Sequence, residues 1–157
     1  MADIEFKLTG VDQAIERMRA LPVELRGKAG RSALGYASKI VRQAAQANAL
    51  RVDDSETGRR IADNVIQRFR GRYFKRTGDL MISVGVGTER GRIPPGNPDE
   101  GPRGNTPHWH LIELGTEQAR AQPFLRPALE QNVMAVESEF GRRLNKAIDR
   151  ILKKQAR

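Results

Sequence analysis

The sequence has 157 residues and a net charge of +9, with 38% hydrophobic, 5% aromatic and 30% charged residues. This length favours one domain with a core poor in large side chains. The absence of cysteine excludes disulfides, thiolate metal sites and a cysteine nucleophile. No apolar run approaches the roughly 20 residues of a membrane span, and the N-terminus lacks the features of a signal peptide. We therefore expect a soluble protein made without an export signal in a reducing cytoplasm.

The first fifty residues predict a strand followed by two helices. Apolar residues alternate with polar ones over residues 4–8, which predicts a strand with one buried face that ends at Gly10. Asp12 is placed to cap a short helix that runs to Arg19. Pro22 then opens a longer helix from Val23 to about residue 50. Its apolar stripe is rich in alanine, which allows another element to approach closely.

The middle of the chain predicts further strands. A turn at residues 57–58 precedes residues 61–69, where a helical turn passes into a strand. Gly71 and Gly78 bracket a basic, hairpin-like connection. Residues 80–87 are rich in β-branched residues and predict a second strand.

A long loop separates this strand from the next predicted element. Residues 88–107 are dense in glycine and proline, which disfavours both helix and sheet, and we expect a flexible loop there. Residues 108–114 return to apolar character and predict another strand, which Gly115 ends.

The strongest helical pattern follows Pro123. Its apolar residues recur at steps of three and four: Leu125, Leu129, Val133, Val136, Phe140, Leu144, Ile148 and Ile151. Together these elements predict an α+β fold over residues 1–157, as a single domain. In it, one mostly antiparallel sheet of about four strands is packed by two long helices.

Two segments concentrate the positive charge. The first holds Arg59, Arg60, Arg68, Arg70, Arg72, Lys75 and Arg76, and the second holds Arg142, Arg143, Lys146, Arg150, Lys153, Lys154 and Arg157. Such segments are often only solvated faces, but they also suit an acidic partner or the DNA backbone. Nonspecific DNA binding by residues 59–76 and 142–157 is therefore an alternative function. Recognisable DNA-reading motifs are missing from the sequence, which argues against sequence-specific binding.

The sequence offers little for catalysis. It contains no phosphate-binding glycine loop, no nucleophile elbow and no His-Glu-x-x-His motif. His108, His110 and Glu113 form the only metal-like cluster, but further ligands would have to be carboxylates. Asp99 and Glu100 are adjacent and would point apart. We predict no enzyme activity, no metal, no cofactor and no small-molecule substrate.

Two neighbouring motifs carry a family resemblance. Leu-Ile-Glu-Leu-Gly-Thr at residues 111–116, followed by Gln-Pro-Phe-Leu-Arg-Pro-Ala-Leu at residues 122–129, resembles the tail-completion or head–tail joining family of long-tailed phages. This family includes gene product ten of HK97-type phages. A Thr-Gly step, a strand ending in Val-Gly, and the N-terminal strand and helix are also similar, in the family's order.

The resemblance implies a structural role in the virion. The chain would form a hexameric ring, assembled in the host cytoplasm, between the head connector or stopper and the tail terminator or tube. DNA would pass through the lumen with nonspecific contacts at most, and no membrane would be involved. The implied structural and interaction residues are Glu113, Gly115, Thr116, Pro123, Phe124, Arg126 and Pro127.

The second motif also has a direct physical interpretation. Pro123 and Pro127 suit the start of a helix, where a missing N–H costs little. Phe124 is expected to anchor this start in the core. Arg126 is unfavourable in a first helical turn, so it needs an acidic partner, and Glu113 is our first candidate.

Overall fold

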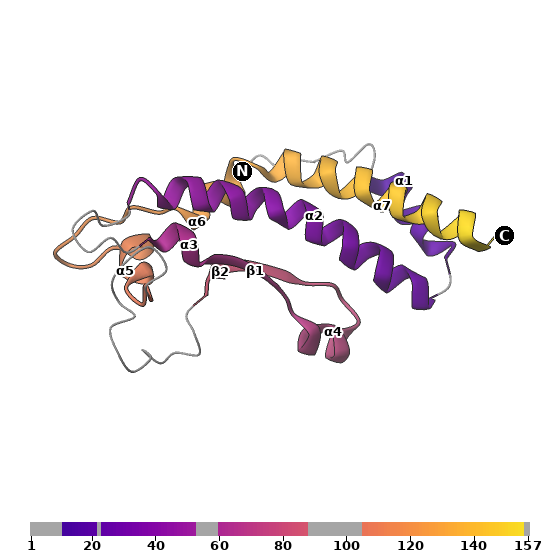
Figure 1. Cartoon of the computed structure of the whole chain (residues 1–157), viewed down its shortest axis with the longest axis horizontal. Helices are drawn as coiled ribbons and strands as arrows, with labels where there is room; N and C mark the ends of the chain where they lie inside the picture. Colours follow the sequence, from indigo (N-terminus) through magenta and orange to yellow (C-terminus); the bar gives the residue numbers. More distant parts are fainter. Residues whose placement is uncertain (1–10, 22, 53–59, 88–104, 156–157) are drawn as a thin grey trace, which may run out of the picture. The chain divides into compact units, whose positions relative to one another are not determined.

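The computed structural model describes residues 11–21, 23–52, 60–87 and 105–155 (Figure 1). The elements are, in chain order, α1 (Val11–Arg19), α2 (Val23–Ala49), α3 (Ile61–Asn64), β1 (Val65–Phe69), α4 (Gly71–Thr77), β2 (Ile82–Val86), α5 (Trp109–Leu114), α6 (Leu125–Glu130) and α7 (Val133–Gln155). The chain forms two compact units. Unit 1 draws on Met1–Ala37, Phe69–Met81 and Met134–Arg157, and unit 2 on Ser38–Arg68 and Ile82–Val133.

The α+β class is confirmed, but in the described residues helix dominates and the sheet is smaller than predicted. Within the described ranges the sheet has two strands, β1 and β2, and not about four. The Gly87 N–H donates to the Asn64 carbonyl at 2.7 Å, and the Ser83 hydroxyl lies 3.5 Å from the Arg68 carbonyl, so the strands run antiparallel. The strand predicted at residues 4–8 and the turn at 57–58 lie outside the described residues, as does the loop from 88 to 104.

Unit 1 is built around α1, the first part of α2 and α7, and Figure 1 shows α1 alongside α7. The short helix predicted up to Arg19 is confirmed as α1. The core combines small and large buried side chains, namely Ala14, Leu21, Ala29, Ala33, Leu144 and Ile148. Because alanine leaves room for close approach, the predicted alanine stripe serves as a contact face in this unit.

The turn between α1 and α2 is held by one side chain. Arg26 Nε donates to the Leu21 carbonyl at 2.7 Å, and its Nη2 donates to the Arg19 carbonyl at 2.6 Å. Carbonyls at a helix C-terminus have no partner within the helix, so this guanidinium satisfies the last carbonyl of α1 and a carbonyl of the turn that follows. An ion pair between Arg17 and Asp149 joins α1 to α7.

Unit 2 uses the rest of α2 as its scaffold. Val41, Ala45 and Ala49 are buried at steps of four, which continues the alanine-rich stripe. Polar side chains of the same helix also reach neighbouring elements. Gln46 Nε2 donates to the Val65 carbonyl at 3.4 Å, and Asn48 Nδ2 donates to the Phe124 carbonyl at 3.2 Å. This part of α2 thus contacts both β1 and the start of α6.

The basic connection between Gly71 and Gly78 is helical, which corrects the hairpin-like connection expected there. Gly78 ends α4 with φ of 80°, and its N–H donates to the Phe74 carbonyl at 2.8 Å. A left-handed glycine at this position is a common helix stop.

Residues 109–114 form helix α5, so the strand predicted over 108–114 is wrong. A short apolar run does not distinguish a strand from a helix. The segment is helical here, and Glu113 is the buried residue of that helix. Trp109, Ile112 and Glu113 are at least partly buried, at helical spacing, while Leu114 is exposed.

The long closing helix is interrupted after Glu130, where the sequence predicts continuity. Asn132 Nδ2 donates to the Ala128 carbonyl at 2.9 Å, so the Asn132 backbone N–H turns to the Leu129 carbonyl at 3.0 Å. Asparagine side chains compete with the helical backbone in this way. The break separates α6 from α7 and leaves Leu129 53% exposed instead of inward.

None of the described helices is both long and apolar enough to cross a membrane.

Candidate interaction site: the corner between α5 and α6

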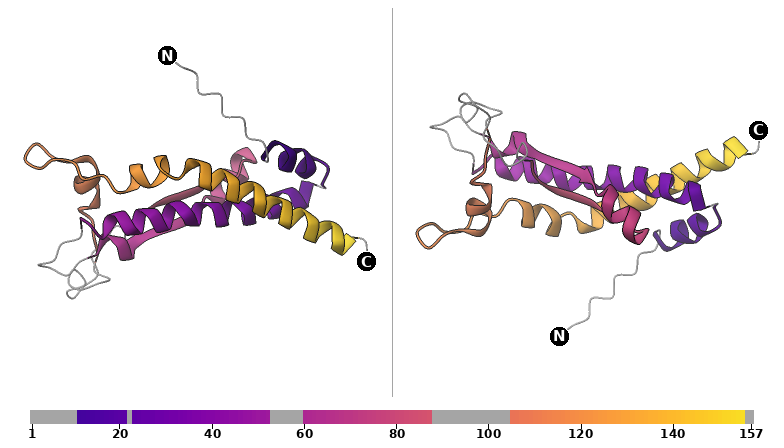
Figure 2. Two further views of the ribbon diagram at one scale, coloured as in Figure 1. Left: turned by 90° about the horizontal axis from the view of Figure 1, so that it is seen from above. Right: turned by 90° about the horizontal axis from the view of Figure 1, so that it is seen from below.

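The two family-like motifs meet in unit 2, where α5, the loop after it and α6 form a sharp reversal of the chain (Figure 2). We call residues 109–130 the α5–α6 corner. Every implied signature residue, from Glu113 to Pro127, lies in it. Sequence positions more than ten residues apart are therefore brought into direct contact.

Glu113 holds the corner together. Its side chain lies on α5, and the residue is only 8% exposed. The backbone N–H groups of Phe124 and Leu125 donate to Oε2 at 2.7 and 2.9 Å, and that of Arg126 donates to Oε1 at 3.0 Å. One carboxylate therefore accepts three hydrogen bonds from the first turn of α6.

This arrangement satisfies the start of α6. The first N–H groups of a helix have no partner within the helix and carry partial positive charge, so a carboxylate is favourable there. Phe124 is the cap residue, and Leu125 and Arg126 follow it. Pro127 occupies the next position and has no N–H to satisfy. Glu113 and Pro127 together leave no donor of this first turn without a partner.

Arg126 contacts Glu113 as expected, but through its backbone and not through its side chain. The expected ion pair would join the two side chains, whereas the observed bond uses the backbone N–H of Arg126. In the part of the chain that the structure describes, the exposed guanidinium of Arg126 forms no ion pair.

Gly115 makes the reversal possible. Its φ is 80°, and a Cβ placed there would lie 2.7 Å from the Ala121 nitrogen and 3.1 Å from the Ala119 oxygen. Thr116 then closes the loop. Its N–H donates to the Ala119 carbonyl at 2.8 Å, while its hydroxyl accepts the Ala119 N–H at 2.9 Å. A backbone bond from Gln122 to Ile112, at 2.8 Å, ties the returning chain to α5.

Phe124 fixes the corner to the rest of unit 2. Its side chain is 1% exposed, its N–H binds Glu113, and its carbonyl accepts the bond from Asn48. Pro123 beside it is exposed. Asn48 could not be identified from the sequence, because an asparagine at a polar helix position reveals no partner until the chain has folded.

The corner also presents apolar side chains to solvent. Leu111 and Leu114 on α5 are 46% and 68% exposed, and Leu129 on α6 is exposed as well. Leu111 and Leu114 are three residues apart on a helix and share a face. The two leucines therefore place apolar area at the surface of a helix that Glu113 holds in position.

His110 makes a local contact in the structure. A ring nitrogen of His110, Nδ1, lies 2.8 Å from the Pro107 carbonyl. The Glu113 carboxylate accepts hydrogen bonds from the backbone at the start of α6. Among the described residues, no group of three or more His, Cys, Asp or Glu side chains is arranged to hold a metal ion. Asp99 and Glu100 lie outside those residues.

The first basic segment is divided between the units. Arg60 and Arg68 are exposed in unit 2, whereas Arg70, Arg72, Lys75 and Arg76 are exposed in unit 1. Arg59 lies outside the described residues. The sequence presents these cations as one group, but the structure places four of them on and beside α4.

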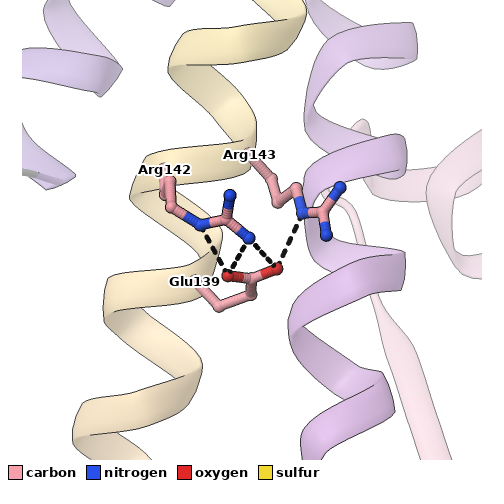
Figure 3. A network of polar contacts seen from close by, with 3 residues as sticks. All are labelled: Glu139, Arg142 and Arg143. Carbon is pink, nitrogen blue, oxygen red and sulfur yellow. Dashed lines mark hydrogen bonds and ion pairs between the residues drawn. The ribbon is translucent and has the colours of Figure 1, made fainter.

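The second basic segment is partly neutralised on α7. Glu139 accepts hydrogen bonds from Arg142 Nε at 2.9 Å and from Arg143 Nε at 2.7 Å (Figure 3). Bonds from Arg143, and then from Arg142, hold the pKa of the Glu139 carboxyl below its ordinary value of 4.5, against the opposing effect of burial. The Arg143 guanidinium also lies 3.8 Å from the centre of the Tyr36 ring. Arg157 lies outside the described residues.

The fold is that of a small α+β protein, and the buried carboxylate of Glu113 has a structural role because it binds the start of α6. A family model described as "Bacteriophage HK97-gp10, putative tail-component" matches residues 12–115, well over half of the chain. The chain belongs to this family of bacteriophage tail components, and its place is accordingly in the virion. No curated protein and no solved structure matches the chain. The matched region ends at Gly115, so it includes Glu113 but not the start of α6.

Proposed function

We propose that this protein is a structural subunit of the ring that completes the phage tail and joins it to the head. In this role it assembles with copies of itself into a hexamer. One ring face binds the head connector or stopper, and the other binds the tail terminator or tube. Membership in a family of tail components supports a role in assembly.

The exposed leucines of the α5–α6 corner carry this proposal. An interface needs an apolar centre held in a defined shape, because ordering a loose segment on binding costs free energy. Leu111 and Leu114 supply exposed apolar area. Glu113 supplies the shape, since its three backbone bonds fix α5 against the start of α6.

A nonsense codon in this gene tests the role. Cells infected with such a phage should accumulate DNA-filled heads and separate tails, seen by negative-stain electron microscopy. Supplying the wild-type protein from a plasmid should restore joined, infectious particles. Infectious particles with attached tails in the absence of the protein would refute the proposal.

The hexamer needs its own measurement, because joining does not depend on a single ring size. Cryo-electron microscopy of the particle neck should show six copies in one layer between connector and tail tube. A layer of another symmetry, or no density for this chain at the neck, would contradict the proposed arrangement.

A further inference from the structure

A second surface, in unit 1, is distinguished by its charge. Arg72, Lys75 and Arg76 are all exposed on α4. They stand three and four residues apart, so they share one helix face. Within the described ranges none of the three has an acidic partner, and Arg76 only approaches the Tyr73 ring, at 5.8 Å from its centre.

The opposite face of α4 is anchored. Phe74 and Phe69 have ring centres 6.0 Å apart, and the Arg31 guanidinium lies 4.1 Å from the centre of the Phe69 ring. A Cβ placed on Gly27 of α2 would lie 3.5 Å from Phe74, so the phenyl ring sits close against that helix. The three cations are thus displayed by a fixed element, which reduces the cost of ordering them on binding.

Helix stability does not explain all three cations. Lys75 and Arg76 lie in the last turn of α4, where positive charge complements the helix dipole. Arg72 lies in the first turn, where the dipole opposes it. The position of Arg72 is therefore not explained by the stability of α4.

We propose that the outer face of α4, formed by Arg72, Lys75 and Arg76, binds the phosphate backbone of double-stranded DNA without sequence preference. Cations that neutralise phosphates release condensed counterions, which makes such binding favourable and dependent on salt. The net charge of +9 adds long-range attraction. This inference does not depend on the ring role proposed above.

The surface chemistry favours DNA over an acidic protein. Protein interfaces bury an apolar centre. No residue of α4 is among the exposed large hydrophobic side chains of the described chain. A face of cations alone suits a polymer that repeats a single negative charge. Arginine adds a planar fork of donors that fits phosphate oxygens.

The experiment compares two triple variants of the full-length protein with equal loss of charge. The α4 variant is Arg72→Gln, Lys75→Gln and Arg76→Gln. The control is Lys39→Gln, Arg51→Gln and Arg120→Gln, three residues that are also exposed but lie outside both basic segments. Circular dichroism establishes that both are folded. Fluorescence anisotropy with a labelled 30-base-pair duplex then gives affinity between about 50 and 200 mM salt, the range over which phosphate contacts are revealed.

Three phosphate contacts predict a clear difference. The plot of log affinity against log salt should become shallower by about 3 for the α4 variant. At the lowest salt its affinity should fall at least roughly tenfold. The control variant should change the slope by less than about 1.

Several results would overturn the proposal. Equal losses in the two variants would mean that net charge alone attracts DNA. No loss in the α4 variant, or no binding by the wild-type protein, would remove the site. Tighter binding of polyglutamate than of duplex at equal salt would reassign this face to an acidic protein partner.

Discussion

At the scale of single residues, Glu113 accepts three backbone hydrogen bonds that a leucine or isoleucine at the same position could not accept. The residue is only 8% exposed, and each oxygen of its carboxylate accepts at least one backbone N–H. A buried charge is tolerated when it is hydrogen-bonded, and here the partners are the positive end of a helix. The expectation that Glu113 pairs with the Arg126 side chain identified the right neighbour and the wrong atoms.

Replacing Glu113 should lower the free energy of unfolding by an amount that depends on the substitution. Glu113→Ala leaves three N–H groups without their acceptor, and we expect a loss of about 2–4 kcal/mol in the free energy of unfolding. Glu113→Gln keeps one acceptor oxygen and should cost about half as much. Urea unfolding followed by circular dichroism measures both.

Glu117→Ala is the matched control, since that glutamate is exposed in the loop of the same corner. It should change stability by less than about 0.5 kcal/mol. A loss in Glu113→Ala no larger than the loss in the control would show that the cap contributes nothing.

Gly115 is required for both its backbone angle and its lack of a side chain. Gly78 shares the φ of 80° but has open space where a Cβ would lie, and Gly85 has open space without the unusual angle. We expect Gly78→Ala to cost about 1–2 kcal/mol through its backbone alone. Gly115→Ala should cost about 3 kcal/mol or more, because overlap with Ala121 is added.

Thermal unfolding of the three glycine variants provides the comparison, with Gly85→Ala expected near the wild-type midpoint. Equal effects at Gly78 and Gly115 would mean that the loop yields to the added methyl group.

At the scale of elements, apolar periodicity identified the long helices but neither the short helix at residues 109–114 nor the break after Glu130. Residues 23–50 repeat their apolar positions over many turns and form α2, whereas the single helix predicted from residue 125 to residue 151 is divided into α6 and α7. Residues 108–114 contain too few positions to separate a strand from a helix, and tertiary contacts with α6 decided the outcome. Asn132 ended α6 through a side-chain bond that no apolar pattern records.

Acid should remove a stabilising interaction within α7. The folded-state pKa of Glu139 lies below 4.5 because of its two arginine bonds. Its contribution to stability is therefore complete above that pH and is lost as pH falls through the lowered pKa. Wild type should exceed Glu139→Gln in urea midpoint at pH 6.5, and this difference should shrink at pH 3.

Glu130→Gln serves as the reference for this comparison, because Glu130 is exposed on α6. Its difference from wild type should be nearly the same at both pH values. A Glu139→Gln difference that is equally independent of pH would show that its arginine bonds contribute no stability.

At the scale of the whole molecule, the proposed role in head–tail joining depends on the exposed leucines of the corner. Leu111→Ser with Leu114→Ser removes exposed apolar area and should leave the unfolding midpoint almost unchanged. In a complementation assay it should reduce joined, infectious particles at least tenfold. Leu152→Ser on α7 is the control, since Leu152 is also exposed. Normal particle yield with the double variant would place the interface elsewhere.

The sequence by itself determined what depends on local spacing and composition. It specified the α+β class, α1 and α2, and the passage from a helical turn into β1, because each arises from a repeat within one segment. It also indicated the family, because the resemblance depends on the order of residues along the chain and not on their contacts. Only the tertiary structure decided that residues 109–114 are helical and that Glu113 caps α6. It also decided that the basic segment divides, with α4 displaying three cations on one face. Those outcomes depend on which distant backbone groups need partners, and that is settled only when the chain has folded.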